Sequence, residues 1–390
     1  MKNSFLFGIG ITLLLSSCSR YQQDLRISNC TLQENSDTGY TKAANVQQAM
    51  EELVRSGVPG AAIAIYTNGK FWTTATGFAK LENQTPMQTC HLQYLQSISK
   101  TYMAVAVLKL YEQGKIDLDA PITQYLPAKY SNAITDAQKI TVRMLLNHTS
   151  GIPEYNFAPA YVTYLLQHPD HLFTPDDYIG YIKHKPLDFA PGSRYSYRNT
   201  NYVLLALLTD ALTGNHAAFI AETIFKPLKF TNTFYRNDAG YLTYANLVNS
   251  YWDRNSNGLV ENASQLQRNN VATLIGDDGI VTTPVEAVLF LKGLLEGKLL
   301  ADTTLKQMEN WVHDSNGKPR YGLGLTYTKI NGHAAYGHSG GGIGAGCELY
   351  YFPDKNIYMF IAINLGTVTD SPLQEKVAVA REKLYDALLQ

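Results

Sequence analysis

The pattern of apolar and polar positions predicts one antiparallel sheet built from both ends of the chain and flanked by helices. Strand-like apolar runs occur early and late in the sequence: 61–66, 71–78, 321–327, 334–337, 347–352 and 357–364. Helical spacing occurs beside them, at 44–55, 101–114, 284–295 and 372–389. The Asn-Gly pairs 68–69 and 331–332 are strong signals for tight hairpins. The pattern therefore predicts an α/β (α+β) fold.

The middle of the chain has a different pattern. Residues 116–271 are helical and rich in loops and tyrosines, with no long strand. After the N-terminal segment, about 350 residues remain, and this is more than one small hydrophobic core usually holds. We therefore expect an α/β sheet domain made of 44–115 and 272–390, and a large helical insertion, 116–271, as a second domain.

The N-terminus resembles an export signal. Residues 1–17 contain one lysine and the apolar run Phe5 to Leu15, which has the length of a signal-peptide core. The signal ends at Cys18 and resembles a bacterial lipoprotein signal, in which the cysteine is lipidated. The alternative is an ordinary secretory signal with a chance cysteine. Residues 18–43 then form a flexible tether, and we expect an exported, lipid-anchored protein of the bacterial cell envelope.

Charge and cysteine content narrow the range of partners. The chain has 32 Lys and Arg against 33 Asp and Glu, so neither nucleic acid nor an anionic membrane surface is an expected partner. Contact with the membrane is expected only through the lipid anchor. The other cysteines, Cys30, Cys90 and Cys347, match no metal-site spacing and receive no role. His168 and His171 are best explained as loop residues, so no metal site is predicted.

The candidate chemistry begins at Ser97-Ile98-Ser99-Lys100, at the start of the helix expected over 101–114. Ser97 and Lys100 are one helical turn apart and share a face. A lysine that is kept neutral by burial can take the proton of a serine hydroxyl and so activate it. The N-H groups at the helix start would stabilise an oxyanion. The alternative is a plain helix start, with Ser97 as N-cap and Lys100 in solvent.

A second S-x-x-K sequence serves as an internal comparison. It spans Ser315 to Lys318 and contains an Asn-Gly pair. An Asn-Gly pair is typical of a turn, and a turn cannot hold both side chains on one helical face. We predict no catalytic role for Ser315.

Three motifs in order resemble those of the serine β-lactamase and penicillin-binding-protein superfamily. They are Ser97-x-x-Lys100, Tyr197-Arg198-Asn199 and His338-Ser339-Gly340. The resemblance extends from about Val46 onward and is strongest to the class C β-lactamase branch with its DD-peptidase and esterase relatives. Tyr-x-Asn occurs elsewhere in the chain, but Tyr197 has the Pro191-Gly192 lead-in and precedes an apolar helix.

The resemblance implies a role for each motif. Ser97 is the nucleophile, Lys100 its proton acceptor, and Tyr197 exchanges the proton with the leaving group and with the deacylating water. A tyrosinate form of Tyr197 requires that Lys100 and other donors lower its pKa. The oxyanion hole is formed by the backbone N-H groups of Ser97 and Gly341. Substrate-binding residues are implied as well, with Asn199 also holding Lys100: Asn199, His338, Ser339 and Gly340. No cofactor is implied.

The expected function is a serine hydrolase that forms an acyl-serine intermediate on ester or amide bonds. His338 stands where β-lactamases usually carry lysine, which favours an esterase or a D-amino-acid peptidase-like enzyme. Thr326 follows the Tyr-Gly-Leu-Gly-Leu segment, where the carboxypeptidase branch has a cation. The expected partner is a small ester, a peptide or a peptidoglycan-derived substrate.

Other functions remain as alternatives. One is a weak class C-type β-lactamase, and another is an inactive lipoprotein that binds peptidoglycan or glycan. A Ser-His-Asp hydrolase is a third, but it needs a G-x-S-x-G elbow at a strand-to-helix turn, and we predict no such turn.

Overall fold

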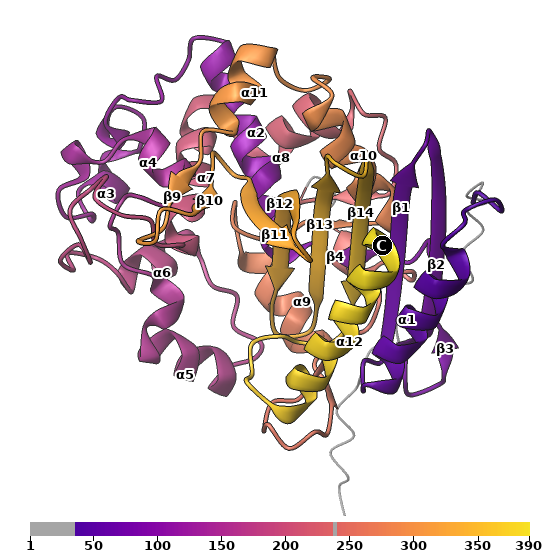
Figure 1. The fold of residues 1–390 in the computed structure, drawn as a ribbon. Coiled ribbons are helices and arrows are strands. Elements are labelled where there is room, and N and C mark those ends of the chain that lie inside the picture. Colours follow the sequence, from indigo (N-terminus) through magenta and orange to yellow (C-terminus); the bar gives the residue numbers. More distant parts are fainter. Residues whose placement is uncertain (1–35, 237–239) are drawn as a thin grey trace, which may run out of the picture.

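The computed structural model describes residues 36–236 and 240–390. The expected signal, Cys18, Cys30 and most of the expected tether lie outside these residues. Figure 1 shows one large sheet, with two helices in front of it and a helical region beside it.

Within the described residues, nine antiparallel strands form this sheet in the order β3-β2-β1-β14-β13-β12-β11-β10-β9. In chain order the strands are β1 (Gly60–Thr67), β2 (Lys70–Lys80), β3 (Thr85–Pro86), β9 (Val312–His313), β10 (Pro319–Tyr321), β11 (Thr326–Ile330), β12 (His333–Gly341), β13 (Gly346–Phe352) and β14 (Ile357–Ile363). Strands β1 and β14 are neighbours inside this sheet, as its third and fourth strands, with Ala62 opposite Ala362. This pairing confirms the predicted sheet built from both chain ends.

The Asn-Gly pairs form the predicted hairpin turns. Asn68 and Gly69 have φ of 51° and 81°, and they join β1 to β2. Asn331 and Gly332, with φ of 50° and 85°, join β11 to β12. Two successive residues with positive φ match the right-handed twist of the flanking strands.

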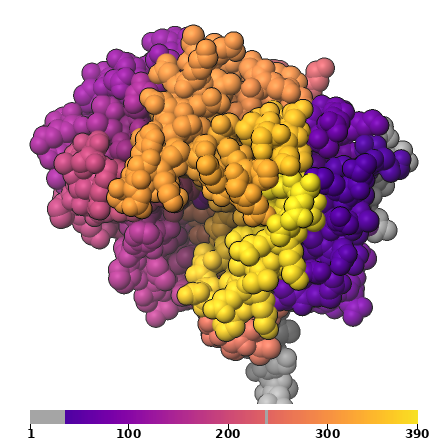
Figure 2. Space-filling view, in the orientation of Figure 1, coloured from indigo at the N-terminus to yellow at the C-terminus, as the bar shows by residue number. Residues whose placement is uncertain are grey.

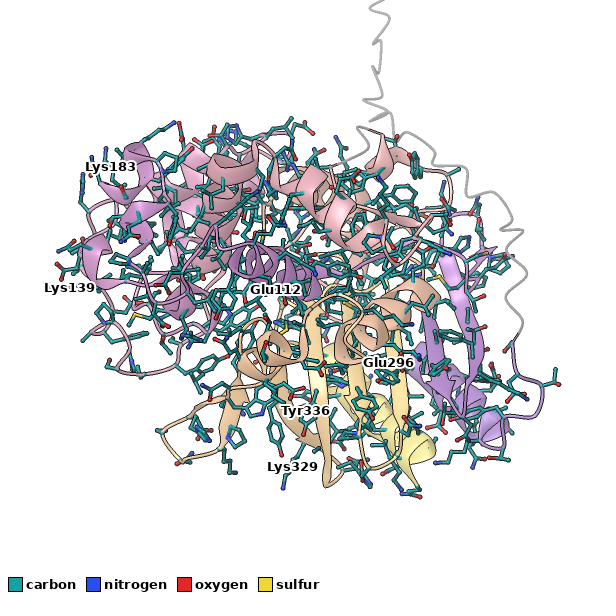
Figure 3. All side chains as sticks on the ribbon, turned by 90° about the horizontal axis from the view of Figure 1, so that it is seen from above. Glu112, Lys139, Lys183, Glu296, Lys329 and Tyr336 are labelled. Carbon is teal, nitrogen blue, oxygen red and sulfur yellow. The ribbon has the colours of Figure 1, made fainter. Side chains whose placement is uncertain are left out.

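Helices cover both faces of the sheet. On one face, α1 (Ala43–Arg55) and α12 (Pro372–Leu389) pack against apolar side chains of β1, β13 and β14. On the other face, α2 (Ser99–Glu112) and α10 (Pro284–Leu295) bury a larger core that continues into the helical region. Helix α2 is therefore enclosed between the sheet and the helical region. Figure 3 shows its last residue, Glu112, between Lys139 of that region and Glu296 on the sheet side.

The middle of the chain is helical, as the sequence pattern indicates. Its helices are α3 (Ala128–Ser131), α4 (Val142–Leu146), α5 (Pro159–Gln167), α6 (Pro175–Gly180), α7 (Asn199–Thr213), α8 (His216–Ile220) and α9 (Ser264–Thr273). Its described strands have two residues each: β5 (Thr233–Phe234), β6 (Tyr251–Trp252) and β7 (Glu261–Asn262). Strand β5 joins β4 (Gln93–Tyr94) and β8 (Val281–Thr282) in a small sheet. The boundary that the sequence suggests at 271–272 falls inside α9.

One strand prediction was wrong. Residues 321–327 do not form one strand, because the chain leaves the sheet after Tyr321 and returns at Thr326. The intervening segment packs on α2, where Thr101 Oγ1 donates a hydrogen bond to Gly324 O at 2.8 Å. Gly324 has φ of 84°, and a Cβ there would lie 2.2 Å from the Cβ of Ala104. The alternating pattern could not reveal this contact.

Across the described residues, no single helix is long and apolar enough to cross a membrane. Helix α7 and the segment His216–Phe225 would together be long and apolar enough, by length and composition only, but the two are bent by 85° relative to each other.

Candidate active site

Ser97 lies in a short 3-10 turn, Gln96–Ile98, directly before α2. Its Oγ is 2.9 Å from Lys100 Nζ. Helix α2 has no side-chain cap, and Lys100 is completely buried. The structure therefore contradicts the alternative of a capping serine with a solvated lysine. Gln96 has φ of 46°, a strained conformation that clusters at functional sites.

Lys100 lies in an environment that favours its neutral form. Its Nζ also donates a hydrogen bond to the main-chain oxygen of Asp277 at 2.9 Å. Burial lowers the pKa of Lys100 below its usual value, and the carboxyl groups of Asp277, Asp278 and Glu154 oppose this shift less strongly. A lower pKa increases the fraction of neutral amine, which can accept the Ser97 proton.

Tyr197 lies beside this pair, with its ring centroid 5.0 Å from Lys100 Nζ. Its Oη is buried and faces the Ser97 hydroxyl without a well-formed hydrogen bond. Burial raises the pKa of Tyr197 well above 10, and the Ser97 hydroxyl opposes this only partly. Burial therefore favours the neutral phenol of Tyr197 over the tyrosinate in the resting protein.

Asn199 is close to the site but does not hold Lys100 as expected. It is the first residue of α7, and its backbone N-H donates to the Glu154 carboxylate. The hydrogen-bond partners of Lys100 Nζ are instead Ser97 Oγ and Asp277 O. The carboxylate of Glu154 thus fixes the start of α7, two residues after Tyr197.

His338 lies on β12 and is neutral. Its Nδ1 donates to Ser339 O at 2.6 Å, so Nε2 accepts from Tyr321 Oη at 2.9 Å. Burial lowers the pKa of His338 to about 3. The side chain therefore offers no cation to a substrate carboxylate at neutral pH.

The end of β12 has a free edge beside the nucleophile. Pairing with β11 stops at Gly337, whereas pairing with β13 continues to Gly341. Gly342 N donates to Ala345 O, and hydrogen bonding alternates along an antiparallel pair. The N-H and C=O groups of Ser339 and Gly341 therefore point away from β13, toward the free edge.

Gly340 brings this edge close to Ser97. A Cβ at Gly340 would lie 2.5 Å from Leu95 O and 2.8 Å from the Cβ of Gln96. Only glycine allows β12 to approach the turn that carries the nucleophile so closely. The structure thus brings together the residues of all three motifs, from three separate parts of the chain.

Three buried carboxyl groups behind Lys100 were missed by the sequence reasoning. Burial raises the pKa of Glu154 and Asp278 to about 7 and that of Asp277 to about 6. Tyr155 Oη donates to Asp277 Oδ2 at 3.1 Å. The Asp277-Asp278 pair in the sequence was the available signal, but only burial distinguishes it from a surface pair.

His148 was also missed as a site residue. It has φ of 60° and is fully buried. Its Nδ1 accepts from Arg198 N at 3.2 Å, and its ring centroid is 4.4 Å from that of Tyr197. Burial lowers the pKa of His148 well below its usual value. The neutral ring is therefore a packing support for Tyr197.

The other sequence patterns that could carry catalysis or bind a metal lie in a turn, a strand and a loop, and they do not form a second site. Ser315 lies in a turn whose backbone N-H groups bond to Asp314 Oδ1, which confirms the prediction of a turn. The letters G-x-S-x-G do occur at 337–341, but Ser339 lies within β12 and is followed by another strand. His168 follows α5, and its ring lies tilted against that of Tyr164, with 4.2 Å between the ring centroids. In the described part of the chain, no group of three or more His, Cys, Asp or Glu could hold a metal ion.

Comparison with known families and structures identifies the family and the fold. The Beta-lactamase family model matches residues 43–381. The chain belongs to this family. It resembles the solved structure of a D-stereospecific amidohydrolase from Streptomyces sp. (29% identity, TM-score 0.74, 86% of this chain and 97% of that chain). D-amino acid amidase from Ochrobactrum anthropi shares the fold (22% identity, TM-score 0.77, coverage 89% and 98%).

Relatives of this β-lactamase-family protein among curated proteins are longer. N-acetylmuramyl-L-alanine amidase of Bacillus subtilis is 29% identical over 210 residues, which are 50% of this chain and 46% of the relative. Penicillin-binding protein 4* of the same organism is 30% identical over 161 residues, or 40% and 33%. The chain thus matches less than half the length of these relatives.

Proposed function

We propose that the protein is a serine hydrolase that cleaves ester or amide bonds through an acyl-Ser97 intermediate. The observation that carries the proposal is the 2.9 Å contact between Ser97 Oγ and the buried Lys100 Nζ. Family membership and the similarity to an amidohydrolase support it.

In this mechanism, neutral Lys100 accepts the Ser97 proton while Oγ bonds to the substrate carbonyl carbon. The backbone N-H groups of Ser97 and Gly341 stabilise the oxyanion, and one such donor contributes about 2.7–4 kcal/mol. Tyr197, as a neutral phenol, passes a proton to the leaving ester oxygen or amide nitrogen as that bond breaks. Water then attacks the acyl carbon and gives up one proton, through Tyr197 and Lys100, to Ser97 Oγ as the bond from Oγ to the acyl carbon breaks, which releases the acid product and restores the Ser97 hydroxyl.

The proposed substrates are small esters and amides or peptides of D-amino acids. Neutral His338 supports this choice, because it cannot neutralise the carboxylate of a β-lactam. The edge of β12 can pair with the backbone of a peptide. The test compares kcat/KM for a p-nitrophenyl ester, a D-amino-acid amide or D-Ala-D-Ala peptide, and a chromogenic cephalosporin. A cephalosporin turned over faster than the ester would favour the β-lactamase alternative.

A covalent serine probe tests the nucleophile. We expect a fluorophosphonate to label the wild type and Ser315→Ala, but not Ser97→Ala. Lys100→Ala should lose labelling while it keeps its fold, and combining it with Ser97→Ala should add no further loss, because the two residues act as one unit. Equal labelling rates in Lys100→Ala and the wild type would exclude Lys100 as the base. A folded wild type without labelling or turnover would favour the inactive binding protein.

We also propose export and a lipid anchor at Cys18, with the protein in the bacterial cell envelope. The sequence Leu15-Ser16-Ser17-Cys18 and the polar segment after it support this proposal. One acyl chain binds membranes only weakly, so stable retention needs a multiply acylated cysteine. We expect Cys18→Ser to move the protein from the membrane fraction to the soluble fraction. An unmodified Cys18 in the wild type, found by mass spectrometry, would contradict the anchor.

A further inference from the structure

A row of aromatic side chains crosses the sheet at the end where α10 finishes. Each member lies directly opposite the next one on the neighbouring strand, so all of them point to the face that α2 and α10 cover. From β2 to β11 this aromatic row consists of Phe71, Tyr66, Tyr358, Tyr351, Tyr336 and Tyr327. Trp311 extends it, since its ring centroid lies 5.6 Å from those of Tyr327 and Tyr336. Neighbouring strands are about 4.8 Å apart, so the row is about 24 Å long.

The aromatic row lies where the last turn of α10 ends. In that turn, Lys292 Nζ is 4.8 Å from the ring centroid of Tyr66. Figure 3 labels Glu296, which directly follows α10, and Tyr336 of the row, and both lie on the same side of the molecule. Figure 2 looks onto the opposite face, where the yellow helix α12 lies. The row is therefore separate from the hollow between the orange strands and α12 in that view.

The aromatic row carries hydroxyl groups that are available to a ligand. All its members are half-buried except Tyr358, which is buried. In the described part of the chain, none of its tyrosine hydroxyl groups has a hydrogen-bond partner, and each of these oxygens reaches the surface. A hydroxyl group can both donate and accept. The row thus presents a line of unpaired hydroxyl groups along the edges of apolar rings.

This combination fits an uncharged, polyhydroxylated chain. The C-H groups of a pyranose ring pack on aromatic rings, and its hydroxyl groups exchange hydrogen bonds with phenol hydroxyl groups. A membrane contact needs protruding apolar side chains, and no member of the row is among the exposed large apolar residues. Charges of both signs border the row, which does not favour a polyanion: Lys292, Lys329, Glu296 and Glu309.

Tyr336 places the aromatic row next to the candidate active site. It lies two residues before His338 on β12, so the two side chains point to the same face, about 7 Å apart along the strand. The mechanism above uses no residue of the row. A polymer held there would keep the active site close to the polymer without occupying it.

We propose that the aromatic row binds one extended chain of uncharged β-linked hexopyranoses, as a second binding site beside the candidate active site. The spacing of the strands is close to the length of one sugar ring in an extended chain, so about five sugars would cover the row. A β-1,4-linked chain is extended, whereas an α-1,4-linked chain curves away from a straight row. The proposal does not depend on the proposed hydrolysis, because it concerns binding alone.

The experiment measures binding by isothermal titration calorimetry in the Ser97→Ala background, so that no turnover interferes. We expect chitohexaose, a β-1,4-linked chain, to bind at least about tenfold more tightly than chitobiose, because only the longer chain spans the row. Tyr336→Leu and Tyr351→Leu should each weaken chitohexaose binding at least about fivefold. Tyr195→Leu is the matched control, because Tyr195 is also half-buried but lies in the active-site cleft, stacked on Tyr321. It should leave the affinity unchanged.

Three results would overturn the inference: a folded protein that does not bind chitohexaose, equal affinities for chitobiose and chitohexaose, or a loss in Tyr195→Leu as large as that in Tyr336→Leu. The last result would place the glycan in the cleft. Binding of the Cys18→Ser protein to phosphatidylcholine vesicles that Tyr336→Leu abolishes would instead identify the row as a membrane contact. If the leucine variants do not fold, Tyr336→Phe and Tyr351→Phe remove only the hydroxyl groups and are compared with Tyr195→Phe in the same way.

Discussion

Replacing Glu154 by glutamine should change both the stability of the protein and its pH dependence. The Glu154 carboxylate accepts hydrogen bonds from Asn156 N and Asn199 N. A glutamine keeps one acceptor oxygen and cannot serve both donors equally. Losing one hydrogen bond to a buried donor costs about 1–3 kcal/mol. At pH 5 the folded protein holds Glu154 protonated, and its hydroxyl oxygen can still accept one N-H, which the amide nitrogen of glutamine cannot do. We therefore expect Glu154→Gln to be destabilised by this amount at pH 5.

The pH dependence follows from the pKa of Glu154, which burial raises from 4.5 to about 7. A raised pKa means that the folded protein binds the proton more tightly than the unfolded chain does. The resulting stability is present below pH 4.5 and is lost as the pH rises through about 7, a difference of about 3 kcal/mol. Glutamine has no such proton. The stability deficit of Glu154→Gln should therefore shrink, or reverse, between pH 5 and pH 8.

Urea unfolding at pH 5, 6.5 and 8 measures this effect, with Asp177→Asn as the matched control. Asp177 also accepts a backbone N-H at a helix start, from Thr174, but at an exposed position. Asp177→Asn therefore measures the same carboxyl-to-amide change at an exposed helix start. Asp277 and Asp278 also have raised pKa values. Both residues are present in the wild type and in Glu154→Gln, so their contributions to the pH dependence largely cancel in the difference. A deficit of Glu154→Gln that is the same at pH 5 and pH 8 would refute the reasoning.

Three further outcomes are expected. Because ionised Glu154 raises the pKa of Lys100, the acidic limb of kcat/KM should move to lower pH in Glu154→Gln, and an unchanged limb would contradict this electrostatic link. Gly324→Ala should lower the free energy of unfolding by about 1–3 kcal/mol and reduce activity, because its Cβ would lie 2.2 Å from a Cβ of α2; a melting temperature equal to that of the wild type would argue against it. His338→Lys should raise cephalosporin turnover relative to ester turnover, since a cation would replace a neutral ring whose pKa burial lowers to about 3; an unchanged ratio on the two substrates would count against this explanation of specificity.

The sequence by itself determined the elements whose causes are local. Asn-Gly pairs at 68–69 and 331–332 require positive φ and therefore predict hairpins wherever the strands lie. The separation of Ser97 and Lys100 by one helical turn follows from helical geometry alone. The early and late strand patterns sufficed to predict that β1 and β14 share one sheet.

Only the tertiary structure decided what depends on burial and close packing. The pKa of Tyr197 rises because residues distant in sequence remove water from its hydroxyl group, so a tyrosinate could not be excluded from the motif. The break between β10 and β11 arises because Gly324 approaches α2. The free edge of β12 arises because β11 begins opposite Gly337, so the residues of β12 after Gly337 have no partner on that side. Glu154, Asp277 and Asp278 act on Lys100 through space, and no sequence spacing encodes that distance. Local geometry thus placed the nucleophile and its base, whereas desolvation by the assembled fold set their chemistry.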